Sequence, residues 1–261
     1  MPTSRPSCAI LPATAADDPR LAAVRSHLFD AALQEKQSAE AWTMQSSKML
    51  KVTLGTDVLA AKGVMVAYQG QVEFHHEGAG SVNKMLKKML TSEDQPLMRV
   101  TGNGEVFFAR LAQDIFTVQL EGDALSIDGA NLLAFDASLS WDIHRVQGAG
   151  ILSGGLFNVV LSGHGQVALT SDGPPMLLDC SQQPTFVDLQ SAVAWSANLV
   201  PQVRSSMNVR SLLRGGSGEA FQYAFHGPGF VVVQPSESET GGAAPQQGNQ
   251  GPGGIVGNLF G

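Results

Sequence analysis

The sequence predicts an all-β protein, and two observations support this fold class. Short runs of Val, Ile, Leu and Phe alternate with glycine-containing turns between Met49 and Gln234, at the spacing of about eight to twelve residues that is typical of sandwiches and barrels. Two short sequence elements also recur three times within this stretch. Such repetition indicates copies of one supersecondary unit. We therefore expect residues 45–235 to form one β domain of three pseudo-symmetric repeats.

The first recurring element is a glycine followed three residues later by a phenylalanine. Its copies begin at Gly104, Gly154 and Gly218 and reach Phe107, Phe157 and Phe221. A closely spaced glycine pair follows in two copies, Gly163 with Gly165 and Gly227 with Gly229, whereas the first copy has Gln113 and Ile115 there. Glycine pairs are typical of tight turns between strands, so we expect turns at these positions.

The second recurring element is an aliphatic residue, an alanine and an aromatic residue. Its copies are Val66-Ala67-Tyr68, Leu133-Ala134-Phe135 and Val193-Ala194-Trp195. Asp128 and Asp188 lie six residues before their alanines, where the first copy has Ala61. We expect the three aromatic residues to occupy equivalent core positions about a pseudo-threefold axis, with packing as their role.

The order of the two elements predicts a closed ring. The chain begins inside a unit, at the Ala67 element, and ends with the element at 218–234, which has no partner after it. We expect this last element to complete the first unit in space, so that N-terminal and C-terminal strands pair. The result is a closed β-sandwich, which would have no exposed strand edges.

One insertion, Ser81–Leu90, interrupts the β pattern. Its apolar residues recur at helical spacing, and three lysines fall on the opposite face. The sequence therefore predicts a short amphipathic helix with Ser81 as its cap. Two interpretations stay open: the helix covers one end of the barrel, or it contacts a protein partner or an anionic membrane surface. In the second case the contact residues are Lys84, Lys87, Lys88, Met85 and Met89.

Two segments flank the β domain. Residues 1–44 are expected to be partly helical or flexible, because Asp18 and Pro19 suit the beginning of a helix over 17–36. Residues 236–261 are rich in Gly and Pro. Such a segment buries too little apolar area to offset its ordering entropy, so we expect a flexible tail.

Charge and composition exclude several classes of protein. The net charge of −7 and the pI of about 5.3 argue against a general nucleic-acid-binding protein. The sequence contains no run of about 18 uncharged apolar residues, as a spanning helix needs, and its first residues do not resemble an export signal. Cys8 and Cys180 are too few for a disulfide framework. We expect a cytoplasmic protein.

The sequence shows no convincing catalytic, cofactor or metal motif. Gly163, Gly165 and Ala168 have the spacing of a dinucleotide fingerprint, but the residues that follow are typical of a strand and not of a helix. His75 and His76 are adjacent, so on a strand they point to opposite faces and cannot easily share a metal. We therefore expect no catalytic residue, no cofactor and no metal.

Four strings of the sequence resemble the Altered Inheritance of Mitochondria family, number twenty-four, and most closely its actinobacterial members. They are Leu59–Gly70, Pro96–Val100, Gly154–Phe157 and Gly216–Phe221. The resemblance implies a compact domain of three pseudo-repeats, shaped as short double-stranded β-helices and often assembled further. It places the fold with the tryptophan RNA-binding attenuation protein. Mitochondrial members of the family are linked to inner-membrane organisation, and the bacterial ones are cytoplasmic proteins of unknown function. No ligand-contacting residue carries over to this sequence.

These observations together predict a non-enzymatic binding or scaffolding protein that forms homo-oligomers. A further protein partner or an anionic membrane surface would bind at the basic helix, and no nucleic acid is expected. The first alternative is a small-molecule binding module, with a ligand near the axis between Tyr68, Phe135 and Trp195. The second alternative is an uncharacterised enzyme.

Overall fold

The computed structural model describes residues 33–76, 97–145, 157–205 and 221–236. They form fifteen strands and one short 3-10 turn, η3 (Gly129–Asn131). The strands are β1 (Trp42–Ser46), β2 (Met49–Thr53), β3 (Val58–Ala61), β4 (Met65–His76), β5 (Leu97–Phe108), β6 (Asp114–Asp128), β7 (Leu132–Asp136), β8 (Ser140–Arg145), β9 (Phe157–Ser171), β10 (Met176–Asp179), β11 (Thr185–Asp188), β12 (Ala192–Ser196), β13 (Gln202–Ser205), β14 (Phe221–Phe225) and β15 (Phe230–Val233). The predicted all-β class is confirmed.

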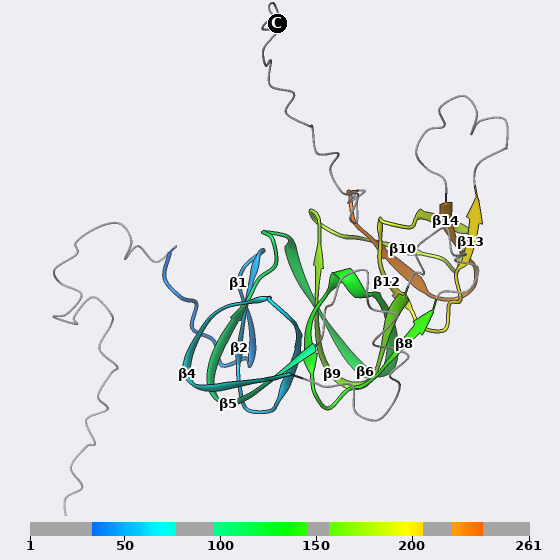
Figure 1. Ribbon diagram of the computed structural model, residues 1–261. Helices are drawn as coiled ribbons and strands as arrows, with labels where there is room; N and C mark the ends of the chain where they lie inside the picture. Colours follow the sequence, from blue (N-terminus) through cyan, green and yellow to red (C-terminus); the bar gives the residue numbers. More distant parts are fainter. Residues whose placement is uncertain (1–32, 77–96, 146–156, 206–220, 237–261) are drawn as a thin grey trace, which may run out of the picture.

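The strands fall into three consecutive groups, which we call the first unit (β2–β5), the second unit (β6–β9) and the third unit (β10–β15). In the first unit β5 pairs with β2, β3 and β4, and in the second unit β9 pairs with β6, β7 and β8. In the third unit β15 pairs with β10 and β12, while β14 pairs with β11 and β13. All of these pairings are antiparallel. Figure 1 shows the units side by side, with β4 at one end of the row and β13 and β14 at the other.

Two further strand pairs, which we call the joints, connect neighbouring units. β3 of the first unit pairs with β7 of the second, and β6 of the second unit pairs with β12 of the third. Among the described strands the first and third units do not pair, and the large sheet runs from β1 to β10 without closing. The predicted closed ring is therefore wrong. The last strands, β14 and β15, complete the third unit and not the first.

The aliphatic-Ala-aromatic element has the same local geometry in all three units. The strand register shifts by one residue between Met65 and Ala67 in β4, and β7 and β12 carry the same shift immediately before Ala134 and Ala194. Such a β-bulge places two residues of one strand opposite one residue of its partner and increases the local twist. The threefold repeat as a whole stays a prediction, which this shared geometry favours.

Glycine pairs lie within the long strands β5 and β9 and between the short strands β14 and β15. Gly102, Gly163 and Gly227 have φ angles of 113°, 119° and 112°, in the left-handed region where side chains are strained. The glycine of the first unit that corresponds to Gly163 is thus Gly102. The predicted alignment of Gly104 with Gly154 and Gly218 is wrong, because Phe107 lies near the end of β5 whereas Phe157 and Phe221 begin their strands. The recurring glycine and phenylalanine therefore do not fix the register between the units.

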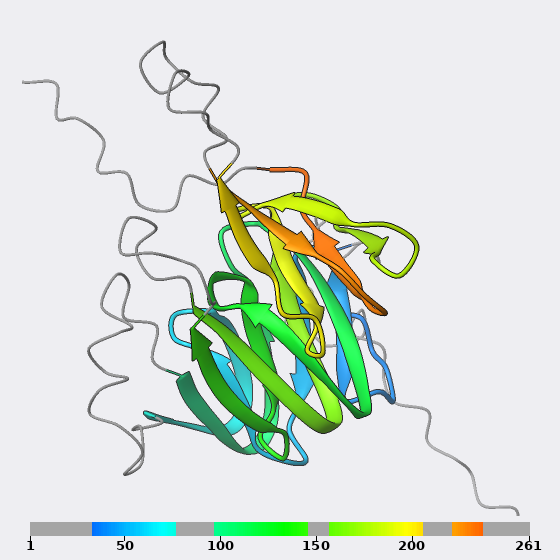
Figure 2. The same ribbon diagram turned by 90° about the vertical axis from the view of Figure 1, so that its right-hand side faces the viewer.

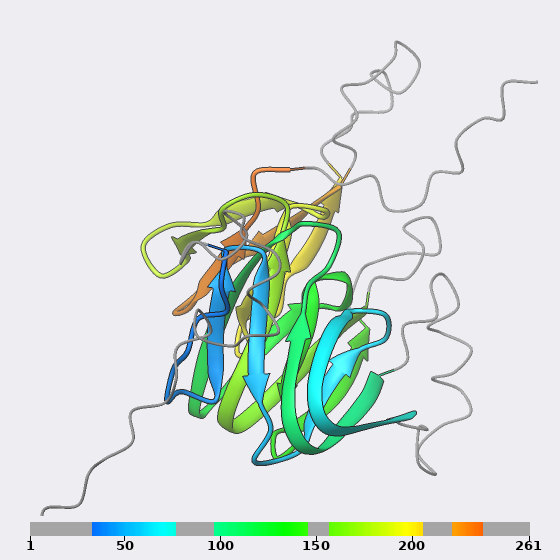
Figure 3. The ribbon, with the colours of Figure 1, turned by 90° about the vertical axis from the view of Figure 1, so that its left-hand side faces the viewer.

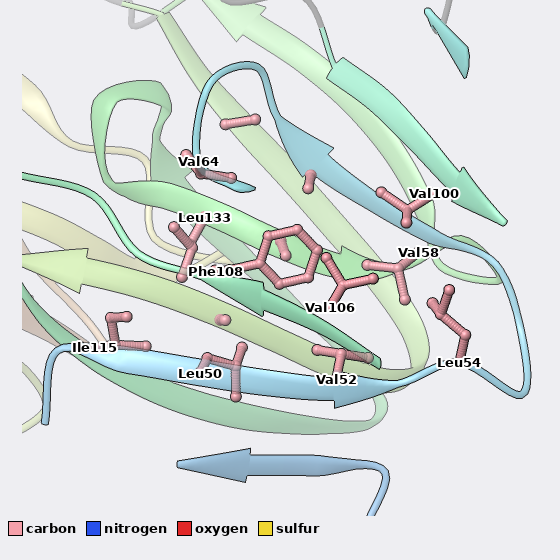
Figure 4. Packing of buried hydrophobic residues seen from close by; sticks show 14 residues of the cluster. Leu50, Val52, Leu54, Val58, Val64, Val100, Val106, Phe108, Ile115 and Leu133 are labelled. Atoms are coloured by element: carbon pink, nitrogen blue, oxygen red, sulfur yellow. The ribbon is translucent and has the colours of Figure 1, made fainter. Parts of the chain in front are cut away.

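Three hydrophobic clusters form the core, one towards each end of the row and one in the middle. Figure 4 shows the first cluster, in which the ring of Phe108 lies between Val58 and Leu133. Phe135 belongs to the second cluster and Trp195 to the third, and both are buried. Tyr68 is 50% exposed, so the prediction of three equivalent core aromatics about one axis is wrong for this residue.

Several predicted segments fall outside the described residues. They are the amphipathic helix Ser81–Leu90, the tail from residue 237 onward and most of the N-terminal helix over 17–36. Residues 33–36, the described end of that predicted helix, form a turn and a bend followed by residues without regular secondary structure.

Candidate functional site: two unpaired sheet edges

The contact residues predicted from the sequence, Lys84, Met85, Lys87, Lys88 and Met89, all lie outside the described residues. The part of the chain that the structure describes has other features with functional potential. These are two sheet edges that carry exposed aromatic residues, a buried cluster of polar residues, a buried lysine and one cavity.

The first edge is strand β4, which pairs with β5 on one side only within the described chain. Figure 3 shows it as the cyan strand that curls around one end of the molecule. Its residues Val66 and Tyr68 are 52% and 50% exposed. The strand bends at Gly70 (φ 88°), and the ring of Tyr68 meets that of Phe74 edge-on at 5.4 Å. The bend thus gathers apolar side chains at the edge.

The second edge is strand β11, whose only described partner is β14. It belongs to the end of the molecule that faces the viewer in Figure 2. Phe186 of this strand is 51% exposed. The guanidinium of Arg204 lies 5.8 Å from the centre of its ring, and the ring of His226 packs edge-on at 6.3 Å. These contacts hold an apolar ring at the surface.

Unpaired edges expose backbone N–H and C=O groups that can pair with another chain. Among the described strands, β1, β8, β10 and β13 are also edges. β8 carries the exposed pair of Asp142 with His144 (3.4 Å), and β4 carries a similar exposed pair of Glu73 with His75 (3.2 Å), so edge charge does not distinguish these two strands. β10 exposes Met176 and Leu177, so apolar exposure alone does not single out β4 and β11.

A cluster of polar residues lies between the second and third units. The side-chain amide of Asn158 donates a hydrogen bond to the hydroxyl of Ser126, and both residues are buried. Asp128, which faces Asn158 across the strands, accepts a hydrogen bond from the Ala130 amide at 2.9 Å. Burial raises the pKa of Asp128 from 3.8 to about 6, although that hydrogen bond opposes the change. Burial and the nearby charge of Asp128 also raise the pKa of Tyr223. The cluster therefore holds a carboxyl that titrates near neutral pH.

Lys51 is buried in β2, with its ammonium 2.6 Å from a carboxylate oxygen of Glu35 and 2.9 Å from one of Glu105. Burial alone would lower the pKa of Lys51, but the hydrogen bonds and charges of the two glutamates outweigh it and raise the pKa. Glu35 precedes β1, and the side chain of Gln45 bonds both the N–H and the C=O of Lys36. Residues 33–41, which we call the strap, are thus attached to β1 and β2.

A cavity of about 390 Å³ lies between β6 and the segment that follows β12. Its apolar wall includes Val118, Leu120 and Phe230, and its polar side chains are Asp123, Ser196 and Asn198. All three polar side chains already bond to backbone groups, those of Glu121, Phe230 and Pro228 respectively. Phe135 and Trp195 do not line this cavity, so the expected ligand position between the three recurring aromatics is not supported.

Two classes of site are missing from the described part of the chain. No three residues among its His, Cys, Asp and Glu lie close enough to hold a metal ion. None of its helices is long and apolar enough to cross a membrane.

Sequence reasoning missed two of these features. The desolvation of Asp128 depends on residues far away in the sequence, such as Tyr223, so no local pattern indicates it. Phe186 could have been found, because it lies two residues before Asp188, whose recurrence with Asp128 is visible in the sequence.

Comparisons with known proteins agree with this architecture. The family model described as mitochondrial biogenesis AIM24 matches residues 42–236. Among solved structures, the crystal structure of a Streptococcus pyogenes protein has a similar fold, with a TM-score of 0.59, 20% sequence identity and coverage of 74% of this chain and 91% of that chain. No curated protein matches the sequence. Because the family model spans most of the chain, the protein belongs to the mitochondrial biogenesis AIM24 family.

Proposed function

We propose that this protein is a non-enzymatic scaffold that assembles from several copies of itself through its sheet edges. The observation that carries the proposal is the pair of unpaired edges, β4 and β11, in the first and third units. Each edge holds a half-exposed aromatic ring, Tyr68 or Phe186. Aromatic residues are enriched where proteins associate, and edge pairing adds backbone hydrogen bonds to that contact. A cytoplasmic location fits the buried free thiol of Cys180.

Native mass spectrometry of the untagged full-length protein tests self-assembly. We expect the wild type to appear at multiples of 27.4 kDa. The substitutions Tyr68→Lys and Phe186→Lys each place a charge on one edge and should each yield monomer. The matched control is Val200→Lys, which charges another exposed apolar position, 68% exposed, outside both edges. It should leave the oligomeric state unchanged. A wild type that is monomeric at micromolar concentration would overturn the proposal.

A small-molecule binding module is the second candidate function, and the cavity beside Ser196 favours it. Its volume of about 390 Å³ lies within the range of about 300–1,000 Å³ that ligand sites occupy. A ligand that binds only the folded protein raises the melting temperature. We expect Ala197→Leu, which fills part of the cavity, to abolish any such shift in a metabolite screen. A screen in which no metabolite shifts the melting temperature would count against this function.

The basic segment at 81–90 is a further proposed contact, which rests on the sequence alone. Charge reversal of Lys84, Lys87 and Lys88 should weaken co-sedimentation with vesicles that contain anionic lipid, because each lysine near such a surface contributes about 1 kcal/mol. The control is Lys62→Glu, which reverses one exposed charge elsewhere. Equal sedimentation of the reversed and wild-type proteins would exclude a membrane role for this segment.

A further inference from the structure

We propose that β11 of one copy pairs antiparallel with β4 of a second copy, head to tail, and so forms the same joint that connects the units within one chain. This inference rests on the proposed self-assembly and specifies its geometry. It identifies which strands meet, in which direction, and which residues lie opposite each other.

The two joints within the chain have the same construction. In the first joint Leu59 of β3 lies opposite Phe135 of β7, and in the second Ser126 of β6 lies opposite Trp195 of β12. In both cases the second strand of the joint carries the aliphatic-Ala-aromatic element, and its aromatic residue is the middle one of three paired residues. One additional backbone hydrogen bond extends each joint. Ala137 N–H donates to the Asp57 carbonyl at 3.0 Å, and Ala197 N–H donates to the Ala124 carbonyl at 3.2 Å.

The glycines with positive φ show that β4 corresponds to β7 and β12, the joint strands that carry the aliphatic-Ala-aromatic element. In the second unit Ala134 pairs with Ala168, five residues after Gly163. In the third unit Ala194 pairs with Val232, five residues after Gly227. In the first unit Ala67 pairs with Phe107, five residues after Gly102. The β-bulge precedes the alanine in every case. Strand β4 therefore has the geometry of β7 and β12 but no described strand on its outer side.

The same count shows that β11 corresponds to β3 and β6, the other strand in each of the two joints. Asp128 pairs with Asn158, five residues before Gly163. Asp188 pairs with Gln222, five residues before Gly227. Ala61 pairs with Leu97, five residues before Gly102. Because the joint residues Leu59 and Ser126 lie two positions before Ala61 and Asp128, the corresponding residue of β11 is Phe186.

This correspondence fixes the register between two copies. Phe186 lies opposite Tyr68, Val187 opposite Ala67 and Thr185 opposite Gln69. The hydrogen bond that extends each of the other two joints corresponds here to one from the Gly70 N–H to the Pro184 carbonyl. Proline has no backbone N–H, but it has the carbonyl oxygen that this bond needs. The third joint thus pairs two aromatic residues across the strands, and such pairs stabilise antiparallel sheets.

Burial separates the completed joints from the open edges. Leu59, Phe135, Ser126 and Trp195 are all at most 2% exposed, whereas Tyr68 and Phe186 are about half exposed. The two aromatic residues occupy positions that are covered wherever a joint is complete. A second copy is the partner that fits, because it supplies the strand that each edge lacks. Strand β10 also exposes Met176 and Leu177, but by the same count its Leu178 corresponds to Val118, which lies in the half of β6 outside the joint.

Disulfide cross-linking between two differently labelled proteins tests the register. One protein carries Gln69→Cys and the other Thr185→Cys, both in a Cys8→Ser background that leaves only the buried Cys180. Directly opposed strand residues have Cα atoms about 4.5–5.5 Å apart, within the range that a disulfide spans. We expect a covalent heterodimer when the two proteins are mixed and oxidised, and no dimer from either protein alone. The control Gln71→Cys, two residues away on β4, should not cross-link to Thr185→Cys.

Each result distinguishes the register from self-assembly itself. Cross-linking of Gln69→Cys with itself would show that two β4 edges meet, which overturns the head-to-tail joint. An oligomeric wild type without the expected heterodimer overturns the register but leaves the scaffold proposal standing. A monomeric wild type overturns both.

Discussion

Individual glycines determine where the long strands bend. A Cβ atom at position 102 would lie 2.2 Å from the backbone oxygen of Gln71, and the φ angle of 113° is itself strained for any other residue. We expect Gly102→Ala to reduce the free energy of unfolding by roughly 3 kcal/mol or more. Gly55→Ala is the matched control, because nothing lies within 4 Å of its added Cβ. Urea denaturation should show a large loss for the first variant and a change below about 1 kcal/mol for the second. Equal midpoints would contradict this account of the bend.

A single carboxyl should make stability depend on pH. The pKa of Asp128 is about 6 in the folded protein, above its ordinary value of 3.8. The folded state therefore favours the protonated form, and this contribution is complete below pH 3.8 and lost as the pH rises through 6. We expect Asp128→Asn, which keeps the capping side chain, to be more stable than the wild type at pH 7, by up to about 3 kcal/mol.

The measurement is the melting temperature between pH 4 and pH 7. The wild type should lose stability over this range relative to Asp128→Asn. Asp188→Asn is the control, because Asp188 caps the corresponding turn by accepting the Gln190 amide at 2.8 Å. Parallel pH profiles for the wild type and Asp128→Asn would show that Asp128 does not cause the pH dependence of stability.

The sequence predicted some of these residues and not others. The aliphatic-Ala-aromatic element coincides with a β-bulge in all three units. This feature was visible in the sequence, because the inserted residue and the small alanine beside it are adjacent in the chain. The first glycine pair was missed, because the Gly-Phe match at Gly104 led to an incorrect alignment. The titration of Asp128 was not predictable, since desolvation arises from tertiary contacts.

Among the elements, the strap depends on one buried ion cluster. Lys51 is 1% exposed, and it contacts one glutamate of the strap, Glu35, and one of β5, Glu105. We expect Lys51→Met to destabilise the protein by about 2 kcal/mol, because both carboxylates lose a buried partner and only part of this loss is recovered by hydration. Hydrogen exchange of the strap amides should accelerate at the same time.

Lys48→Met provides the comparison for this experiment. Lys48 is half exposed and pairs with Asp114 at 3.4 Å, and exposed pairs of this kind contribute at most about 1 kcal/mol. Strap exchange that stays as slow in Lys51→Met as in Lys48→Met would show that other contacts, such as those of Gln45, hold the strap.

At the scale of the whole molecule, the head-to-tail joint predicts that two variants, each unable to assemble alone, will assemble with each other. Tyr68→Lys retains an intact β11 edge, and Phe186→Lys retains an intact β4 edge. Each variant alone should be monomeric, yet an equimolar mixture can form one complete joint and should yield a dimer and nothing larger. Sedimentation velocity measures this directly. A mixture that stays monomeric, or assembles beyond the dimer, would contradict the proposed joint.

The closed ring is the feature of the whole molecule for which the prediction from the sequence was wrong. The order of the recurring elements indicates that the last element lacks a following unit, and the inferred partner was the first unit of the same chain. In the structure the strands β14 and β15 find their partners inside the third unit. Local patterns identify strands and their repetition, but the curvature of a row of units decides whether its ends meet, and no single residue encodes it.

The difference between the two edges has a consequence for growth. Because β4 and β11 are different strands, any open assembly built through them has polarity, with one end that presents β4 and another that presents β11. A molecule that bound one of these strands would stop elongation at that end alone. The cell could therefore set the length of such an assembly, or anchor it in one direction, with a single capping protein.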